Sequence, residues 1–255
     1  MFWVYNNLCM KHPHLNNAPI VEAVIDFRFQ PALNIEYDKI EAIHKTIASE
    51  YPVKHESKQL QLGFVIGPEQ TTQQTVSDET VGYRFENPDQ KYVFVASKNG
   101  FSISKLAPYE DWDKFLLEAK KIAEAYFGVL GNQNITRTAV RYINVIEVAD
   151  ERADFDDYLV AGPKVPEGLP NVVQEFLIRN VIPCFEQKAS VTIVQAYGAE
   201  NPFEKAKIIL DIDAVCLEEY DSNSGKQWEL LDILRTLKNN AFFKSLLPKA
   251  LEPYK

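Results

Sequence analysis

The sequence has little of what metal-binding, redox and secreted proteins use. It holds only three cysteines, in no CxxC pair, and four histidines, in no HExxH arrangement. Few cysteines, odd in number, favour a reduced cytoplasmic compartment over a disulfide-bonded extracellular one. The chain also lacks a P-loop, a GxGxxG turn and a GxSxG elbow, the short motifs of nucleotide-binding and nucleophilic enzymes. We therefore predict no metal, no cofactor and no catalytic residue.

Long apolar runs and an excess of basic charge are missing as well. No run approaches the roughly 20 apolar residues of a membrane helix, and the first residues, MFWVYNNLCMKHPHLNN, do not resemble a signal peptide. Met10 is an alternative start to Met1. Lys and Arg total 27 against 36 Asp and Glu, a net charge of −9. This balance disfavours nucleic-acid binding, which needs a basic face, and suits a basic protein partner. We predict a protein partner or a homo-oligomer.

What is present is a globular composition with clear strand and helix periodicity. Hydrophobic residues make up 46% and charged residues 25% of the chain, close to globular averages. Alternating or continuous apolar runs bounded by turn residues predict strands. The predicted strands are Ile20–Phe29, Gln59–Ile66, Thr80–Glu86, Tyr92–Ser97, Phe101–Leu106, Arg137–Val148, Val172–Ile182, Ala189–Tyr197 and Lys205–Leu217.

Helical spacing of apolar residues predicts four helices between these strands. The first is capped by Asn34 and stopped by Pro52, and the second runs from Pro108 to a stop at Gly128 and Gly131. A short helix is expected over Asp154–Val160. The last helix follows Gly225, carries Trp228, Leu231, Leu234, Ala241 and Phe242 on its apolar stripe, and ends at Pro248.

This order of elements predicts an α+β fold of two similar halves. Each half would be a curved antiparallel sheet packed on a long helix, an order similar to TATA-binding-protein-like and helix-grip folds. The predicted boundaries are a flexible leader over 1–18, a first half over 19–131 and a second half over 132–255, the two halves forming one compact unit. An offset of 116 residues places Ala23 on Ala139, Val24 on Val140 and Trp112 on Trp228.

One strand carries the densest set of polar groups in the chain. Strand alternation puts Arg137 and Arg141 on one face of Arg137–Val148 and Asn144 on the other. Forked guanidinium donors in a row suit a carboxylate or a phosphate. The candidate ligand-binding residues are Arg137, Arg141, Asn144, Glu22, Asp26, Arg28, Asp211 and Asp213.

Two interpretations of these residues stay open. The arginines can pair with Glu22 and Asp26 on the opening strand and with Asp211 and Asp213 on a later one, which would make the set a structural ion-pair network. Alternatively, the arginines hold an anionic ligand, with one of the two late aspartates as a base or a metal ligand.

Several segments in order along the chain carry a family resemblance. They are PIVEAVIDFRF, APYEDW, RYINVIEV, LDID and NNAFFKSLLPKALEPYK. Together they resemble a sporadically distributed bacterial family of about this length, whose members typically read PIVEAVxEIRF and LRYINRI. Asp26 stands where that family usually has Glu, and Val145 where it often has Arg. The patchy distribution implies an accessory gene, such as one of a defence or toxin–antitoxin system, and implies no particular activity.

Two hypotheses from different classes follow. The first is a non-enzymatic cytoplasmic binding protein that acts as the partner or neutraliser of another protein. The alternative is an enzyme that acts on a phosphorylated or carboxylated small molecule, with Arg137 and Arg141 holding the anion.

Overall fold

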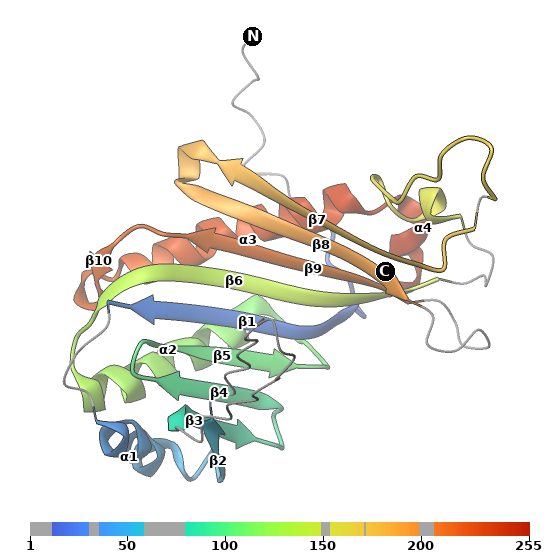
Figure 1. Ribbon diagram of the computed structural model, residues 1–255. Helices are drawn as coiled ribbons and strands as arrows, with labels where there is room; N and C mark the ends of the chain where they lie inside the picture. The colour runs from blue at the N-terminus through green and yellow to red at the C-terminus, as the bar shows by residue number, and fades with distance from the viewer. Residues whose placement is uncertain (1–11, 31–35, 59–79, 149–153, 171, 199–206) are drawn as a thin grey trace, which may run out of the picture.

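The structure, a computed structural model, describes residues 12–30, 36–58, 80–148, 154–170, 172–198 and 207–255. Its centre is one ten-stranded antiparallel sheet with the strand order β2-β3-β4-β5-β1-β6-β9-β8-β7, in which β10 also pairs with β6 (Figure 1). The strands are β1 (Ile20–Phe29), β2 (Val53–Lys58), β3 (Thr80–Asn87), β4 (Tyr92–Ser97), β5 (Gly100–Leu106), β6 (Asn134–Glu147), β7 (Glu175–Cys184), β8 (Ala189–Gly198), β9 (Lys207–Cys216) and β10 (Tyr220–Asp221).

Helices pack on one face of this sheet. They are α1 (Tyr37–Ile47), α2 (Trp112–Leu130), α3 (Lys226–Ser245) and α4 (Pro248–Leu251). Asp111 caps α2 by accepting a hydrogen bond from the Lys114 backbone N–H at 2.8 Å. Gly131 ends it with a φ of 74°, a positive value that glycine adopts readily because it has no Cβ. Figure 1 shows no described helix on the other face, which we call the open face.

The alternation along β1 explains which residues form the core. Ala23, Ile25 and Phe27 are fully buried toward the helices, whereas Glu22, Asp26 and Arg28 project from the open face. Burying a side chain as large as Ile25 or Phe27 stabilises the fold by roughly 1.5–3 kcal/mol. The central β1–β6 pair therefore separates an apolar core from a charged surface.

The sequence predicted the α+β class and most of the strands correctly. The strand predicted over Gln59–Ile66 and the cap predicted at Asn34 lie outside the described residues. The strand that follows α1 is β2, whose sequence VKHESK is too polar to stand out as a strand. The segment predicted as a short helix over Asp154–Val160 forms only a single 3-10 turn, Phe155–Asp157.

Two helix ends differ from prediction. Gly128 lies inside α2, because the helix continues for two residues beyond it, and of the two glycines only Gly131 has a positive φ. Pro248 begins α4 and does not end α3, which stops at Ser245. A proline is well tolerated in the first turn of a helix, where its missing N–H would have no partner.

The offset of 116 residues is wrong for the two central strands. Ala23 lies opposite Tyr142 on the helix-covered face, whereas Ala139 lies opposite Asp26 on the open face. An even offset therefore superposes residues that point to opposite sides of the sheet. Strand register has a period of two, so a shift by one residue moves every side chain to the other face.

Residues 12–18 of the predicted leader lie against α3. The His12 ring stacks on Phe243 with centroids 4.4 Å apart, and its Nε2 is 2.7 Å from Asn240 Oδ1. The Asn17 backbone N–H donates to the Tyr254 carbonyl at 3.3 Å. Within the described ranges, neither α2 nor α3 nor any shorter helix is long and apolar enough to cross a membrane.

Candidate functional site

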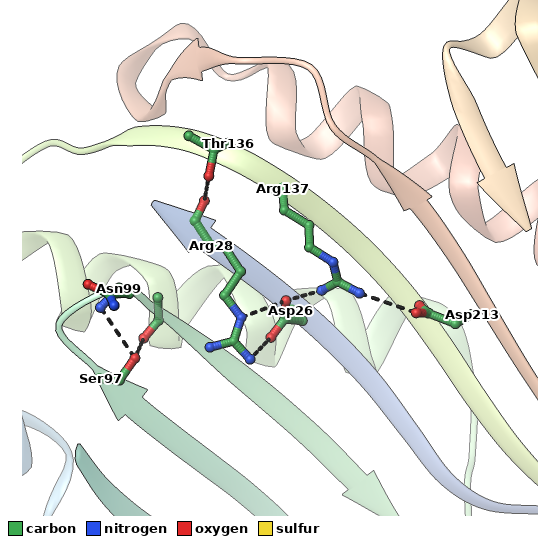
Figure 2. Close-up of polar contacts among 8 residues, drawn as sticks. Asp26, Arg28, Ser97, Asn99, Thr136, Arg137 and Asp213 are labelled. Atoms are coloured by element: carbon green, nitrogen blue, oxygen red, sulfur yellow. Dashed lines mark hydrogen bonds and ion pairs between the residues drawn. The ribbon is translucent and has the colours of Figure 1, made fainter. Parts of the chain in front are cut away.

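The candidate arginines and aspartates meet on the open face, at the strands β1, β6 and β9. Arg28 and Arg137 lie directly opposite each other in the β1–β6 register, an arrangement that is unfavourable between like charges. Asp26 resolves it by accepting from both side chains: Arg28 Nη2 lies 2.8 Å from Asp26 Oδ2, and Arg137 Nη1 contacts Oδ1 (Figure 2). Asp26 is itself buried, and these two cations offset the cost of burying its carboxylate.

Arg137 extends the network across to β9. Its Nη2 donates to Asp213 Oδ2 at 3.2 Å, so one guanidinium links the carboxylates of β1 and β9 (Figure 2). Arg141 makes a separate forked pair, with its Nε and Nη2 at 2.8 and 2.6 Å from the two oxygens of Asp211. Such bidentate pairs are the strongest ion pairs that arginine forms. Each candidate arginine therefore has a carboxylate partner.

Asp213 is the least satisfied member of this cluster. Burial raises the pKa of its carboxyl group, and the nearby Arg137 and Arg141 oppose that rise. Its Oδ1 is buried and has no hydrogen-bond partner among the described residues. A buried acceptor without a partner is costly, so Asp213 contributes less to stability than Asp26 does.

Two candidates stand apart from the cluster. Asn144 lies on the helix-covered face, buried, and its Nδ2 donates to the carbonyls of Leu210 at 2.9 Å and Tyr142 at 3.2 Å. It therefore cannot act together with the arginines. Glu22 makes no ion pair with a described residue, although its charge contributes to the raised pKa of Arg141, which is due mainly to Asp211. The described residues contain no group of three His, Cys, Asp or Glu side chains placed to hold a metal ion.

The edge strand β7 is a surface that sequence analysis did not single out. Among the described strands it pairs with β8 alone. Leu177 is 74% exposed, and Val181 and Ile182 are exposed as well; Phe185, in the turn that follows, is 84% exposed. Its apolar residues predicted the strand, but the exposure of both of its faces depends on its place at the edge of the sheet.

A cavity of about 450 Å³ on the helix-covered side contains further residues that sequence reasoning missed. Lys238 of α3 is only 7% exposed there. The sequence held one signal for it: Lys238 stands four residues after Leu234 and four before Phe242, in the middle of the apolar stripe of α3. A residue at such a position faces the core, so a lysine there is expected to be buried.

Comparison of the chain with protein-family models and with curated proteins finds no match. The assignment of a function therefore depends on the geometry described above.

Proposed function

We propose that the protein is a non-enzymatic binding protein that docks a protein partner on strand β7. The observation that carries the proposal is the exposed apolar edge formed by Leu177, Val181 and Ile182. An edge strand presents unpaired backbone N–H and C=O groups, and an extended segment of another protein can add to it as a further strand. Side chains on alternate positions then supply selectivity.

The opposite edge of the sheet, strand β2, differs from β7 in length and in charge. Strand β2 has six residues, against ten in β7, and carries the exposed Lys54, His55 and Glu56. Short length and charge are the features by which proteins protect an edge from unwanted pairing. β7 is long and largely apolar, so it lacks this protection over most of its length.

The partner that fits best is a basic protein with an extended segment of alternating apolar residues. The net charge of −9 favours association with a basic surface. Such a role agrees with the partner or neutraliser expected of an accessory defence or toxin–antitoxin system. We further propose that the chain consists of two related halves with a TATA-binding-protein-like arrangement. The strand order supports this, since β5, β4 and β3 on one side of the β1–β6 pair correspond to β9, β8 and β7 on the other.

The enzymatic alternative is less well supported by the same geometry. Arg137 and Arg141 are both paired with carboxylates, so an anionic substrate would have to displace Asp211, Asp213 or Asp26. The open-face cluster is better explained as an ion-pair network that holds β1, β6 and β9 in register.

The test compares the wild type with a β7 variant, Leu177→Lys/Val181→Lys, and with Leu117→Lys as a control. Leu117 is 70% exposed on α2, away from β7. A stoichiometric partner should co-purify with the wild type and the control from the native host but not with the β7 variant. In the complex, the amides of Glu175–Cys184 should exchange hydrogen more slowly. A dimer that the β7 variant dissolves would identify the partner as a second copy; a partner that the β7 variant retains would refute the proposal.

A further inference from the structure

The cavity that contains Lys238 lies on the opposite side of β6 from the arginine–aspartate cluster. It is lined by residues 12–20, by residues 109–112 before and at the start of α2, by β6 and by α3. Tyr142 and Asn144 line its floor, whereas Arg141, which directly precedes Tyr142 in sequence, points to the open face. The cavity is therefore a separate feature of the fold and does not involve strand β7.

Lys238 is buried in this cavity without an acidic partner. Its Nζ makes no hydrogen bond or ion pair with any described residue, and its only close polar contact is the face of the Tyr142 ring, 3.5 Å from the centroid. Burial, with a smaller contribution from the Arg235 charge, lowers the pKa of Lys238 to about 7. Lysine is almost never fully buried unless an acidic group pairs with it. Lys238 has no such partner among the described residues, so the site lacks a counter-charge.

Arg235 adds a second cation one turn earlier on the same helix. Its guanidinium lies 5.3 Å from the centroid of the Trp112 ring, and it too forms no ion pair with a described residue. The acidic groups at the rim are already engaged, since Glu110 pairs with Lys114 and Asp111 caps α2. The interior of the cavity is therefore cationic in an otherwise acidic protein.

The walls supply hydrogen-bond donors and flat apolar surface. The hydroxyls of Tyr109 and Tyr142 lie 2.7 Å apart. Burial raises the pKa of Tyr109 to about 12 and raises that of Tyr142 well above its usual value, so both stay protonated at neutral pH. Trp112 and Phe242 contribute aromatic surface, and the cavity volume falls within the range of about 300–1,000 Å³ that is typical of small-molecule sites.

We propose that this cavity binds a small organic anion, a carboxylate or phosphate group attached to a planar ring. The anionic group would lie between Lys238 and Arg235, where it supplies the missing counter-charge. The ring would pack against Trp112 and Tyr109, whose faces favour stacked or edge-on contact with another ring. Neither the protein partner on β7 nor the ion pairs of the open face are required for this binding.

The test is isothermal titration calorimetry of the full chain at pH 7 with four probes. Benzoate and phenyl phosphate combine ring and charge, benzamide has the ring alone, and inorganic phosphate has the charge alone. The variants are Lys238→Met, which keeps the length and apolar stem of the side chain, and Arg235→Met. Lys244→Met, at an exposed position on the same helix, is the matched control. Thermal melting of each variant reports whether it is folded.

Benzoate or phenyl phosphate should bind the wild type with a Kd of about 1 mM or tighter, and benzamide and inorganic phosphate more weakly than either. Lys238→Met and Arg235→Met should each weaken binding roughly tenfold or more, while Lys244→Met should leave it unchanged. Tighter binding of phenyl phosphate would assign a phosphate ligand, and tighter binding of benzoate a carboxylate. The proposal is wrong if neither ring-bearing anion binds saturably, or if folded Lys238→Met and Arg235→Met bind it as the wild type does.

Discussion

Replacing Lys238 by methionine should change how the stability of the protein depends on pH. In the folded protein burial lowers the pKa of this amine to about 7, from the value of 10.5 that an exposed lysine has. Below pH 7 the amine is protonated in both the folded and the unfolded chain, and folding then bears the full cost of burying the charge. Between pH 7 and 10.5 only the unfolded chain holds the proton.

The sign and the size of the effect follow from this difference in bound protons. Where the unfolded chain binds one more proton than the folded chain, the free energy of unfolding rises with pH by about 1.4 kcal/mol per unit. The wild type should therefore gain roughly 3 kcal/mol over Lys238→Met between pH 7.5 and 9.5. At pH 6.5 the variant should be the more stable protein, because methionine fills the same space without a charge.

The assay is urea denaturation followed by circular dichroism at several pH values, with the difference between the two proteins as the measured quantity. Other titrating groups around the amine are present in both proteins and cancel in that difference. They are Arg235 on α3, Tyr109, Glu110 and Asp111 before α2, Tyr142 on β6, and His12 and His14 on the N-terminal segment. Lys244→Met should run parallel to the wild type. If the Lys238→Met curve also runs parallel, Lys238 is not held as a buried, unpaired amine and the reasoning fails.

Four further substitutions test the network and the sheet by urea denaturation at pH 7. Asp26→Asn should lower the free energy of unfolding by about 2–3 kcal/mol, because two arginines lose their shared carboxylate. Asp213→Asn should lower it by less than about 1 kcal/mol, because burial already disfavours the charge of Asp213. Equal losses would contradict this ranking. Asn144→Ala should cost about 2 kcal/mol through two lost hydrogen bonds to backbone carbonyls, and an unchanged midpoint would argue against them. Gly82→Ala should cost about 2–3 kcal/mol, since its Cβ would lie 2.2 Å from the Ala96 carbonyl oxygen on β4; wild-type stability would show that the two strands can separate freely.

The parts of the fold that local periodicity controls could be predicted from the sequence. Alternation in β6 placed Arg137 and Arg141 on one face, and the structure pairs them with Asp26, Asp211 and Asp213, three of the four carboxylates proposed as partners. The β4–β5 hairpin also has a local signal, because the Asn99-Gly100 pair at its turn is typical of tight hairpins. In both cases the deciding signal lies within a few residues of the chain.

The parts that depend on distant contacts could not be predicted. Strand β2 was missed because an edge strand needs little apolar sequence, and the exposure of β7 follows from its place in the strand order. The cavity around Lys238 joins residues from near the N-terminus, the start of α2, β6 and α3. No spacing in the sequence brings Tyr109 to Tyr142 and both of them to α3.

The cations on the two faces of β6 differ in whether a carboxylate already pairs with them. This difference decides whether they can bind an anionic ligand. On the open face Arg28, Arg137 and Arg141 have carboxylates within 3.2 Å, so an incoming anion would gain one ion pair by breaking another. On the helix-covered face Lys238 and Arg235 have aromatic rings beside them, and no carboxylate of a described residue forms an ion pair with either. An anion that enters there removes an existing cost of burial and breaks no ion pair among the described residues. Anion binding is therefore expected on the covered side of the sheet, although the open side carries more arginine.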